Sequence, residues 1–331
     1  MEGYYPGATV NALTEESSLD QLLNSENSLW PYPPQSIATR EGFNAEHTQF
    51  PVASDTNAQL SVSAAFHPTN HMHIGTPDLT IRTADGVLFY VHIHILLSIS
   101  TNSFNSLLLN VVMGATSTLT IPESSSIANI LVHAIYGLSC AHFHPSMQDV
   151  AAAVNVMEIY GLSVTSLLAA GTPTFSLVLS LAPAHALECY VLAASNRLED
   201  LAVAVSPYTL RIKLSDLTDE IVTRMGPIYL RRLFFLHAGR IEALKRVLHD
   251  PPGSHLTTES CDDWEQQSLR DAWTLAIGAL VWEPDPALSN GTILSTLMPL
   301  GEHLTCLECK DSLLDRLRDA LVQWSLVKQT I

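Results

Sequence analysis

The sequence has few basic residues. Of 331 residues, 16 are Lys or Arg and 33 are Asp or Glu, and the only lysines are Lys213, Lys245, Lys310 and Lys328. The formal net charge of −17 repels phosphate backbones, which disfavours nucleic-acid binding by the chain as a whole. We therefore expect no nucleic-acid partner.

Cysteine is also scarce, and targeting signals are missing. Five cysteines without dense spacing provide no disulfide framework, which is typical of a reducing compartment. The opening MEGYYPGATV lacks the basic and apolar regions of a secretory signal. The most apolar run, SLVLSLAPAHALECYVLAAS, contains Pro183, His185 and Glu188 and is a poor membrane span. These absences predict a soluble protein of the cytoplasm, the nucleus or both, with no membrane partner.

Sequence motifs of the common catalytic sites are absent as well. The chain has no G-x-G-x-x-G, no Walker loop, no G-x-S-x-G, no H-E-x-x-H and no EF-hand loop. No nucleophile–base pair or carboxylate pair stands out either. We therefore expect a protein that is not an enzyme, with no catalytic residues, no cofactor and no small-molecule substrate.

What the sequence does contain is enough apolar material for a sizeable core. Hydrophobic residues make up 47% of the chain and charged residues 15%, and the length favours two folded units plus a tail. The tail is predicted at residues 1–72, which are rich in Ser, Asn, Thr, Pro and Gln and show no periodic pattern. We expect this tail to be disordered.

A β-hairpin followed by a helix is predicted after the tail. Two runs with alternating apolar residues, LTIR at 79–82 and VLFYV at 87–91, flank Asp85-Gly86, a pair that supplies the positive φ angles of a tight turn. The next run, HILLSISTNSFNSLLL, has helical spacing and predicts an amphipathic helix over 95–109.

The remaining pattern predicts one more strand and then only helices. STLTIP alternates like a strand, a helix should follow ESSS and stop near Gly137, and the next helix should run from the capping pair Ser146 and Asp149 to Gly161. From Pro183 onward only helical signals occur. The fold class is therefore α+β, with an all-α region at the C-terminus.

The stretch PDLTIRTADGVLFYVHIHILLSISTNSFNSLLL resembles the N-terminal half of a BTB (POZ) domain. The runs ILLSISTNSFNSLL and VHAIYGLSCAHFHP are similar to the large fungal group of BTB proteins with a helical C-terminal region. The resemblance implies a BTB/POZ-like domain at 73–172, with a hairpin, a short sheet and flanking helices, and a helical domain at 173–331. The residues that match the family signature are Asp78, Asp85-Gly86, Phe89, Val91-His92, Ile95-Leu96, Ser100, Phe104 and Leu107-Leu108.

The resemblance implies a scaffold or adaptor that works by protein–protein interaction. BTB domains commonly dimerise through their first helix and strand, so we expect a closed, symmetric homodimer, with the helical region recruiting an unidentified protein partner. The residues expected at the dimer face are Leu79, Ile95, Leu96, Phe104, Leu107 and Leu108.

The alternative function is a substrate adaptor of a cullin-type ubiquitin ligase, as some BTB proteins are. Two departures from the family pattern weaken this alternative. Ile93 stands where many members have Arg or Lys, so Asp78 lacks its usual charged neighbour. Met113-Gly114-Ala115 has no acid where the hydrophobic-x-Glu motif for cullin contact is expected.

A Cys/His grouping near the C-terminus leaves two interpretations open. Cys306 and Cys309 follow His303, and two thiolates at this spacing can bind one tetrahedral zinc ion together with Cys261. His255 also precedes Cys261, but six residues separate them, which is not a usual zinc spacing. The other interpretation, which we favour, is that the cysteines face a core and bind no metal.

A local group of basic residues lies in LRRLFFLHAGRIEALKRVL. It could bind an acidic partner, form a solvated helix face or pair with acids inside the protein. The residues are Arg231, Arg232, Arg240, Lys245 and Arg246.

Overall fold

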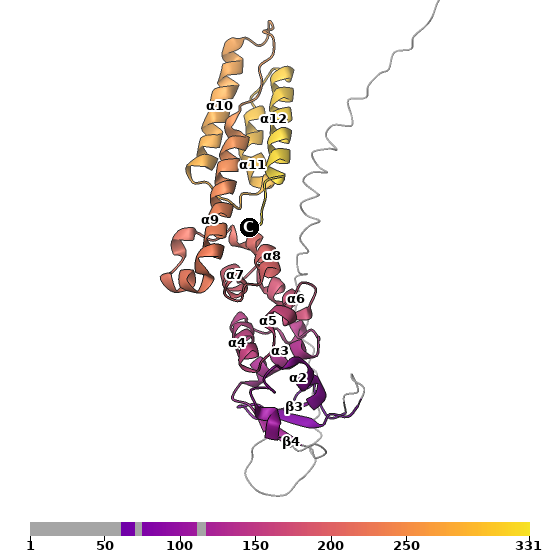
Figure 1. Ribbon diagram of the computed structural model, residues 1–331. Helices are drawn as coiled ribbons and strands as arrows, with labels where there is room; N and C mark the ends of the chain where they lie inside the picture. Colours follow the sequence, from indigo (N-terminus) through magenta and orange to yellow (C-terminus); the bar gives the residue numbers. More distant parts are fainter. Residues whose placement is uncertain (1–60, 70–74, 111–116) are drawn as a thin grey trace, which may run out of the picture. The chain divides into compact units, whose positions relative to one another are not determined.

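The computed structural model describes residues 61–69, 75–110 and 117–331 (Figure 1). The fold is mixed α+β, mostly helical, with one four-stranded sheet in this part of the chain. No helix among these residues has the length and apolarity needed to cross a membrane. Two compact units are present. The N-terminal unit contains the described residues up to Ala243 with 285–287 and 327–331, and the C-terminal unit contains 244–284 and 288–326.

The sheet lies in the N-terminal unit, with strand order β1-β3-β2-β4. β2 (Leu79–Arg82) and β3 (Val87–Val91) form the predicted antiparallel hairpin. β4 (Ser117–Thr120), the strand predicted from STLTIP, runs parallel to β2, and β1 (Ser61–Val62) runs parallel to β3. The predicted strands are therefore present, and β1 is an addition.

The tail predicted at 1–72 lies outside the described residues except for 61–69. This stretch packs on the sheet: the N–H of Ser63 donates to Leu88 O at 2.9 Å, and Phe66 O accepts from the N–H of Tyr90 at 2.9 Å. The Phe66 side chain is buried. A strand of two residues is too short to show a period of two, so the sequence pattern could not reveal β1.

The turn between β2 and β3 contains three residues, Ala84, Asp85 and Gly86. It is closed by the N–H of Thr83, which donates to Val87 O at 3.0 Å. Of the pair predicted to have positive φ angles, only Gly86 does, at +84°. A three-residue hairpin loop needs the left-handed conformation only at its last position, which Gly86 occupies.

The helix predicted over 95–109 is interrupted. α2 (Ile93–Ile99) ends before Ser100, and the short 3₁₀ helix η1 (Leu107–Asn110) follows later. Between them, residues 103–106 all have positive φ angles, from 53° to 62°. Ser, Thr and Asn side chains are frequent between 98 and 106 and bond to nearby backbone groups, which competes with a continuous right-handed helix.

The left-handed turn is held by local side chains. Ser100 Oγ accepts from the N–H of Phe104 at 2.7 Å, and Asn102 Oδ1 accepts from the N–H of Asn105 at 2.8 Å. The turn also buries the Phe104 ring, which stacks on Tyr160 with centroids 4.1 Å apart. These hydrogen bonds and this ring contact offset the cost of the left-handed backbone.

Helices make up the rest of the N-terminal unit. α3 (Ser125–Ile135) ends just before Gly137, and α4 (Met147–Ile159) starts after the Ser146 cap and ends before Gly161, as predicted. α9 is broken at Gly226, whose φ angle is +77°. The remaining helices are α5 (Val164–Leu167), α6 (Pro173–Leu181), α7 (Ala186–Ser195), α8 (Glu199–Thr209) and α9 (Asp219–His249).

One buried core joins the sheet to helices on both sides of residue 172, the predicted domain boundary. Ile81 of β2, Met157 of α4 and Tyr190 of α7 are all fully buried members of this core. The helices as far as α9 therefore complete the core of the N-terminal unit. The chain passes into the C-terminal unit within α9, between Ala243 and Leu244.

Two members of the predicted basic group on α9 have partners inside the N-terminal unit. Arg232 forms an ion pair with Glu199 of α8. Arg240 is buried, and its guanidinium donates to Pro286 O at 2.5 Å and to Val327 O at 3.0 Å. For these two arginines, the structure agrees with internal pairing.

The C-terminal unit is a helical bundle in which the helices run alongside one another (Figure 1). Its core contains Trp273, whose indole N–H donates to Leu248 O at 3.1 Å, and Trp324, whose indole N–H donates to Leu288 O at 2.8 Å. The elements after α9 are α10 (Asp263–Trp282), α11 (Asn290–Leu297), the 3₁₀ helix η4 (Met298–Gly301) and α12 (Leu307–Ser325).

Candidate functional site

The six residues predicted at a dimer face pack against the core of the N-terminal unit. Ile95 and Leu107 are half-buried. The other four, Leu79, Leu96, Phe104 and Leu108, have exposed fractions of 7% or less. The four buried side chains have no surface left for a second chain, whereas Ile95 and Leu107 keep part of theirs. Two neighbouring apolar residues are more exposed. Leu97 of α2 is 40% exposed and Leu109 of η1 is 70% exposed.

The two departures from the BTB pattern have different structural outcomes. Asp78 Oδ1 accepts from the N–H of Ile93 at 2.8 Å, so its carboxylate caps the start of α2 instead of pairing with a basic side chain. The Ile93 side chain is buried. Met113-Gly114-Ala115 lies outside the described residues.

A group of four potential metal ligands is present in the C-terminal unit. His255, Cys261, Cys306 and Cys309 each offer one ligand atom, and these atoms all lie within 4.8 Å of one another. We call this group the Cys/His cluster. Three of its members belong to the predicted zinc grouping. The fourth predicted member, His303, is exposed and lies outside the cluster, and His255 takes its place.

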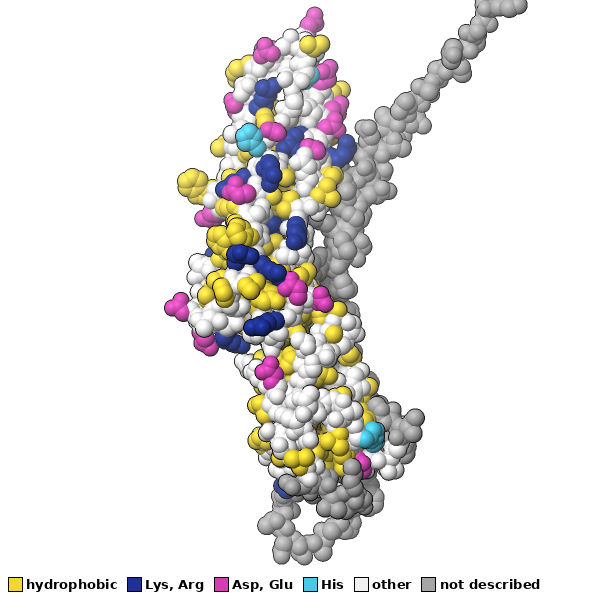
Figure 2. Space-filling view, viewed as in Figure 1, with side chains coloured by type: hydrophobic (Ala, Val, Ile, Leu, Met, Phe, Trp, Pro, Cys, Tyr) yellow, Lys and Arg dark blue, Asp and Glu magenta, His cyan; other side chains and the backbone are white. Residues whose placement is uncertain are grey.

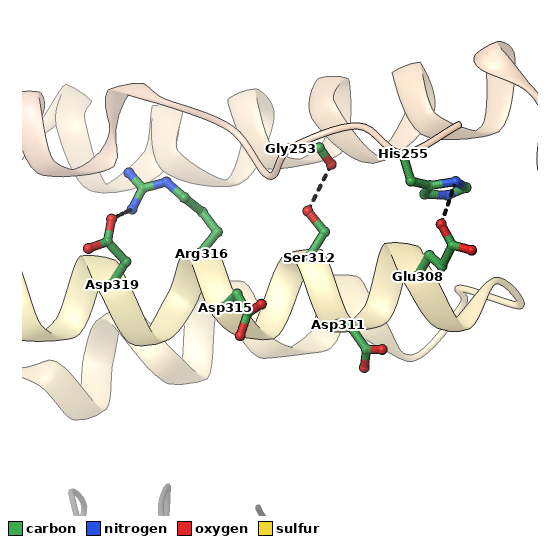
Figure 3. Close-up of a pocket in the computed structure, with 8 residues that line it drawn as sticks. All are labelled: Gly253, His255, Glu308, Asp311, Ser312, Asp315, Arg316 and Asp319. Carbon is green, nitrogen blue, oxygen red and sulfur yellow. Dashed lines mark hydrogen bonds and ion pairs between the residues drawn. The ribbon is translucent and has the colours of Figure 1, made fainter. Parts of the chain in front are cut away.

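A loop between α9 and α10 provides His255 and Cys261. The loop starts at Asp250-Pro251-Pro252, which cannot continue α9, and Ser312 of α12 fixes its path by donating to Gly253 O at 2.8 Å (Figure 3). Near the end of the loop, Thr258 and Cys261 form an antiparallel bridge. Cys261 is followed by Asp262, the N-cap residue of α10.

The start of α12 provides the other two ligands. Cys306 is the N-cap residue and Cys309 lies in the first turn. The N–H groups of Cys309 and Glu308 donate to Cys306 Sγ, and together they hold the pKa of this thiol below its ordinary value. A Cys-x-x-Cys pair at a helix N-terminus therefore presents one thiol that readily becomes a thiolate.

The distances within the cluster are short. His255 Nε2 lies 3.2 Å from Cys309 Sγ and 3.4 Å from Cys306 Sγ, and Cys261 Sγ lies 3.6 Å from Cys309 Sγ. A disulfide bond measures about 2.05 Å, so Cys261 and Cys309 are not bonded to each other.

Two acceptors, a backbone carbonyl and a carboxylate, orient the His255 ring. Its Nδ1 lies 2.8 Å from Leu256 O. The same nitrogen lies 3.2 Å from a carboxylate oxygen of Glu308 (Figure 3). Two acceptors at Nδ1 place the proton on that nitrogen, which leaves the Nε2 lone pair directed at the thiols. The backbone N–H of His255 donates to Gln266 Oε1 at 3.0 Å, and the Gln266 side chain is itself buried.

A shallow groove of about 520 Å³ borders the cluster between the loop and α12 (Figure 3). Glu308, Ser312 and Arg316 of α12 point toward the loop, which carries His255 (Figure 3). Asp311 and Asp315 point away from the loop (Figure 3). The groove contains a carboxylate, Glu308, beside a histidine, His255, but these two groups pair with each other.

The cluster sits in a small apolar core. Cys261 and Cys309 are buried together with Leu269, and Leu300 and Leu304 pack against them. Burial and hydrogen bonds with the neighbouring thiols raise the pKa of Cys261 to about 12, so this thiol is neutral at pH 7 when no metal is bound. Burial by itself does not distinguish the two interpretations, cysteines that pack in a core and cysteines that bind a metal.

One exposed apolar row was missed by the sequence pattern. Trp264, Leu275 and Trp282 of α10 are 76%, 81% and 87% exposed. They are separated by about three and about two helical turns and therefore share one face of the helix. The sequence does contain a signal for this row. Trp264 and Trp282 are each nine residues from Trp273, which places them on the opposite side of the helix from the buried stripe that contains Trp273.

Comparisons with protein-family models, curated proteins and solved structures gave no match.

Proposed function

We propose that this chain is a non-enzymatic protein–protein interaction module. In this proposal the N-terminal unit contains a BTB/POZ-like domain through which the chain self-associates, and the helical region recruits a protein partner. The motif resemblance at 77–109 supports the first part. The exposed row on α10 carries the second part.

The row on α10 has the character of an interface. Figure 2 shows exposed hydrophobic side chains on the C-terminal unit, among charged ones. Tryptophan is enriched at the energetic centres of interfaces, because a large rigid ring buries much apolar area at low entropic cost. Two tryptophans and a leucine on one helix face, each more than three-quarters exposed, offer large apolar side chains to a partner.

Self-association has support from a different place. Leu97 and Leu109 are exposed beside the residues that the BTB resemblance places at the dimer face. Burying both on a second copy would remove apolar area from water without disturbing the core of either subunit. This surface is separate in the sequence from the α10 row, so the two parts of the proposal can be tested independently.

Proximity labelling in the native cell tests the recruitment. The full chain is compared with a variant carrying both Trp264→Ser and Trp282→Ser, and with Leu326→Ser as the matched control. Leu326 is 80% exposed but lies beyond the end of α12, outside the row. We expect the double variant to lose the neighbours that the full chain and the control both label. Equal labelling by all three proteins would contradict recruitment through α10.

Proximity labelling followed by a pull-down separates the scaffold role from the alternative, a cullin adaptor. If a cullin is among the neighbours of the full chain, a pull-down with the cullin N-terminal domain would assign the ubiquitin-ligase adaptor role. Absence of cullin binding would leave the scaffold role.

A further inference from the structure

We propose that His255, Cys261, Cys306 and Cys309 bind one structural zinc ion. The site would be closed, with three thiolates and one imidazole as its four ligands. This assignment does not depend on the interaction function, because it concerns how the C-terminal unit is held together.

The first argument is the geometry. A tetrahedron with Zn–S bonds of about 2.3 Å and a Zn–N bond of about 2.0 Å has edges of roughly 3.8 Å between sulfurs and roughly 3.5 Å between sulfur and nitrogen. The Cys261–Cys309 sulfur distance is 3.6 Å, and the distances from His255 Nε2 to Cys309 Sγ and Cys306 Sγ are 3.2 Å and 3.4 Å. These three distances lie close to the required edges, and all four ligand atoms lie within 4.8 Å of one another.

The second argument is the chemistry of the ligands. Thiolate and imidazole ligands in a four-coordinate arrangement select zinc over magnesium or calcium, which prefer oxygen. The imidazole must bind as the neutral ring through an unprotonated nitrogen. Leu256 O and the Glu308 carboxylate hold the proton on Nδ1 and leave Nε2 free for the metal.

The third argument is that the surrounding structure supports each ligand. Cys306 and Cys309 are fixed by the first turn of α12, and Cys261 is fixed by its bridge to Thr258. The positive end of the α12 dipole also favours the negative charge that three thiolates and one zinc ion leave at the site. These supports resemble the outer shell that structural metal sites require.

Core packing of the cysteines explains the cluster less well. Packing requires apolar contact, which Cys261 and Cys309 have, but it gives no reason for the imidazole nitrogen to point at two thiols. It also gives no reason for Gln266, whose side chain is buried, to hold the backbone of His255. A bound cation accounts for the direction of the imidazole nitrogen, and the bond from His255 N–H to Gln266 holds the loop that carries this ligand.

The expected role is to join three segments that few apolar residues hold. The loop after α9, the start of α10 and the start of α12 meet at this end of the C-terminal unit, where Leu269, Leu300 and Leu304 are the apolar neighbours. Zinc binding would therefore contribute directly to the folding free energy of this unit.

Metal analysis of the full chain is the first test. Protein purified under reducing conditions without chelator should contain about one zinc ion per chain by elemental analysis. After replacement with Co²⁺, it should show the visible absorption of tetrahedral cobalt and the near-ultraviolet bands of thiolate ligands. The thermal unfolding midpoint should fall when zinc is removed by a chelator and recover when zinc is returned.

Substitutions identify the ligands, and the chain offers matched controls. Cys309→Ser and His255→Ala should lose most of the bound zinc and the cobalt spectrum, or alter that spectrum. Cys189→Ser, at a buried cysteine of α7, and His303→Ala, at the exposed histidine near the cluster, should keep both. If a ligand variant fails to fold, the cobalt spectrum of the unsubstituted chain still decides, because its thiolate bands require cysteine ligands.

The proposal would be overturned by a metal-free chain that takes up no Co²⁺ and unfolds at the same temperature with and without chelator. It would also be overturned if zinc and the spectrum survived in Cys309→Ser but were lost in His303→Ala. That result would place the metal elsewhere.

Discussion

At the ends of α3 and α4, two glycines adopt the same left-handed conformation in different surroundings. Gly137 has a φ angle of +64° and Gly161 of +68°. A Cβ atom added at Gly137 would meet nothing within 4 Å, whereas one added at Gly161 would lie 2.5 Å from Asn102 Oδ1 and 2.8 Å from Asn102 N. Gly161 is therefore required both for its backbone conformation and for the close approach of the left-handed turn.

We expect Gly161→Ala to destabilise the N-terminal unit by more than Gly137→Ala. Gly137→Ala carries only the cost of placing alanine in the left-handed conformation, about 1 kcal/mol. Gly161→Ala adds a clash with the Asn102 backbone, for a total of roughly 3 kcal/mol. Chemical denaturation followed by far-ultraviolet circular dichroism measures both free energies of unfolding. Equal losses would show that the contact with Asn102 does not matter.

Asp85 connects the hairpin turn to α3. Its carboxylate accepts from the N–H of Ser125 at 2.9 Å and from the Ser125 hydroxyl at 2.6 Å. Partial burial alone would raise the pKa of Asp85, but the hydrogen bonds from Ser125 and Thr83 outweigh it, and the net pKa is below the ordinary value. The stabilisation is therefore present above the unfolded-state pKa of about 3.9 and is lost as the pH falls through the folded-state pKa.

Asp85→Asn should lower the free energy of unfolding of the N-terminal unit by about 1 kcal/mol at pH 7, since a neutral amide caps α3 less well. The difference from the unsubstituted chain should shrink as the pH falls below about 4. Asp216→Asn, an exposed acid in the same unit, is the control and should have little effect. A difference that stayed constant from pH 7 to pH 3 would contradict this role for the carboxylate.

At the scale of elements, Arg316 of α12 holds the end of α9. Its guanidinium donates to Val247 O and, at 2.7 Å, to Asp250 O, and it lies over the Trp273 ring at 5.5 Å. These carbonyls belong to the last turn of α9 and the residue after it, where no helical partner is available. One largely covered side chain thus joins three parts of the C-terminal unit.

Arg316→Ala should destabilise the C-terminal unit by about 2 kcal/mol, because the carbonyls of Val247 and Asp250 lose a charged donor and Trp273 loses its contact with the guanidinium. Arg318→Ala is the control on the same helix, since Arg318 pairs with an exposed acid, Asp315, and should cost less than about 1 kcal/mol. Tryptophan fluorescence follows the unfolding, because four of the five tryptophans lie in this unit. Similar losses for the two variants would contradict the bridging role.

The elements with strong local signals could be predicted from the sequence. The hairpin has alternating runs beside a Gly, and α3 and α4 have caps and terminal glycines, so local chemistry was sufficient there. The interruption of the helix predicted over 95–109 could not be predicted in this way. The apolar spacing continues through a stretch whose Ser and Asn side chains bond to the backbone. Apolar periodicity alone does not register this competition.

The candidate metal site could be predicted only in part. The Cys306-x-x-Cys309 pair is a local signal, and it was identified. The choice between His255 and His303 depends on the path of the loop after α9, which is fixed by the bond between Ser312 and Gly253 across many residues. Sequence proximity favoured His303, whereas the three-dimensional path brings His255 to the thiols.

At the scale of the whole molecule, the proposed function is association instead of catalysis. In the proposed function, the chain binds a second copy near the exposed residues Leu97 and Leu109 and a different protein through the α10 row. Self-association is the part that can be measured on the purified protein without knowing the partner.

Sedimentation velocity of the full chain is the most direct test. We predict a dimer at about 10 to 50 µM, a range in which stable homodimers persist. A variant with Leu97→Glu and Leu109→Glu should sediment as a monomer. Ile228→Glu, at an apolar residue of α9 that is 60% exposed, should remain a dimer. An unsubstituted chain that stays monomeric throughout this range would contradict self-association.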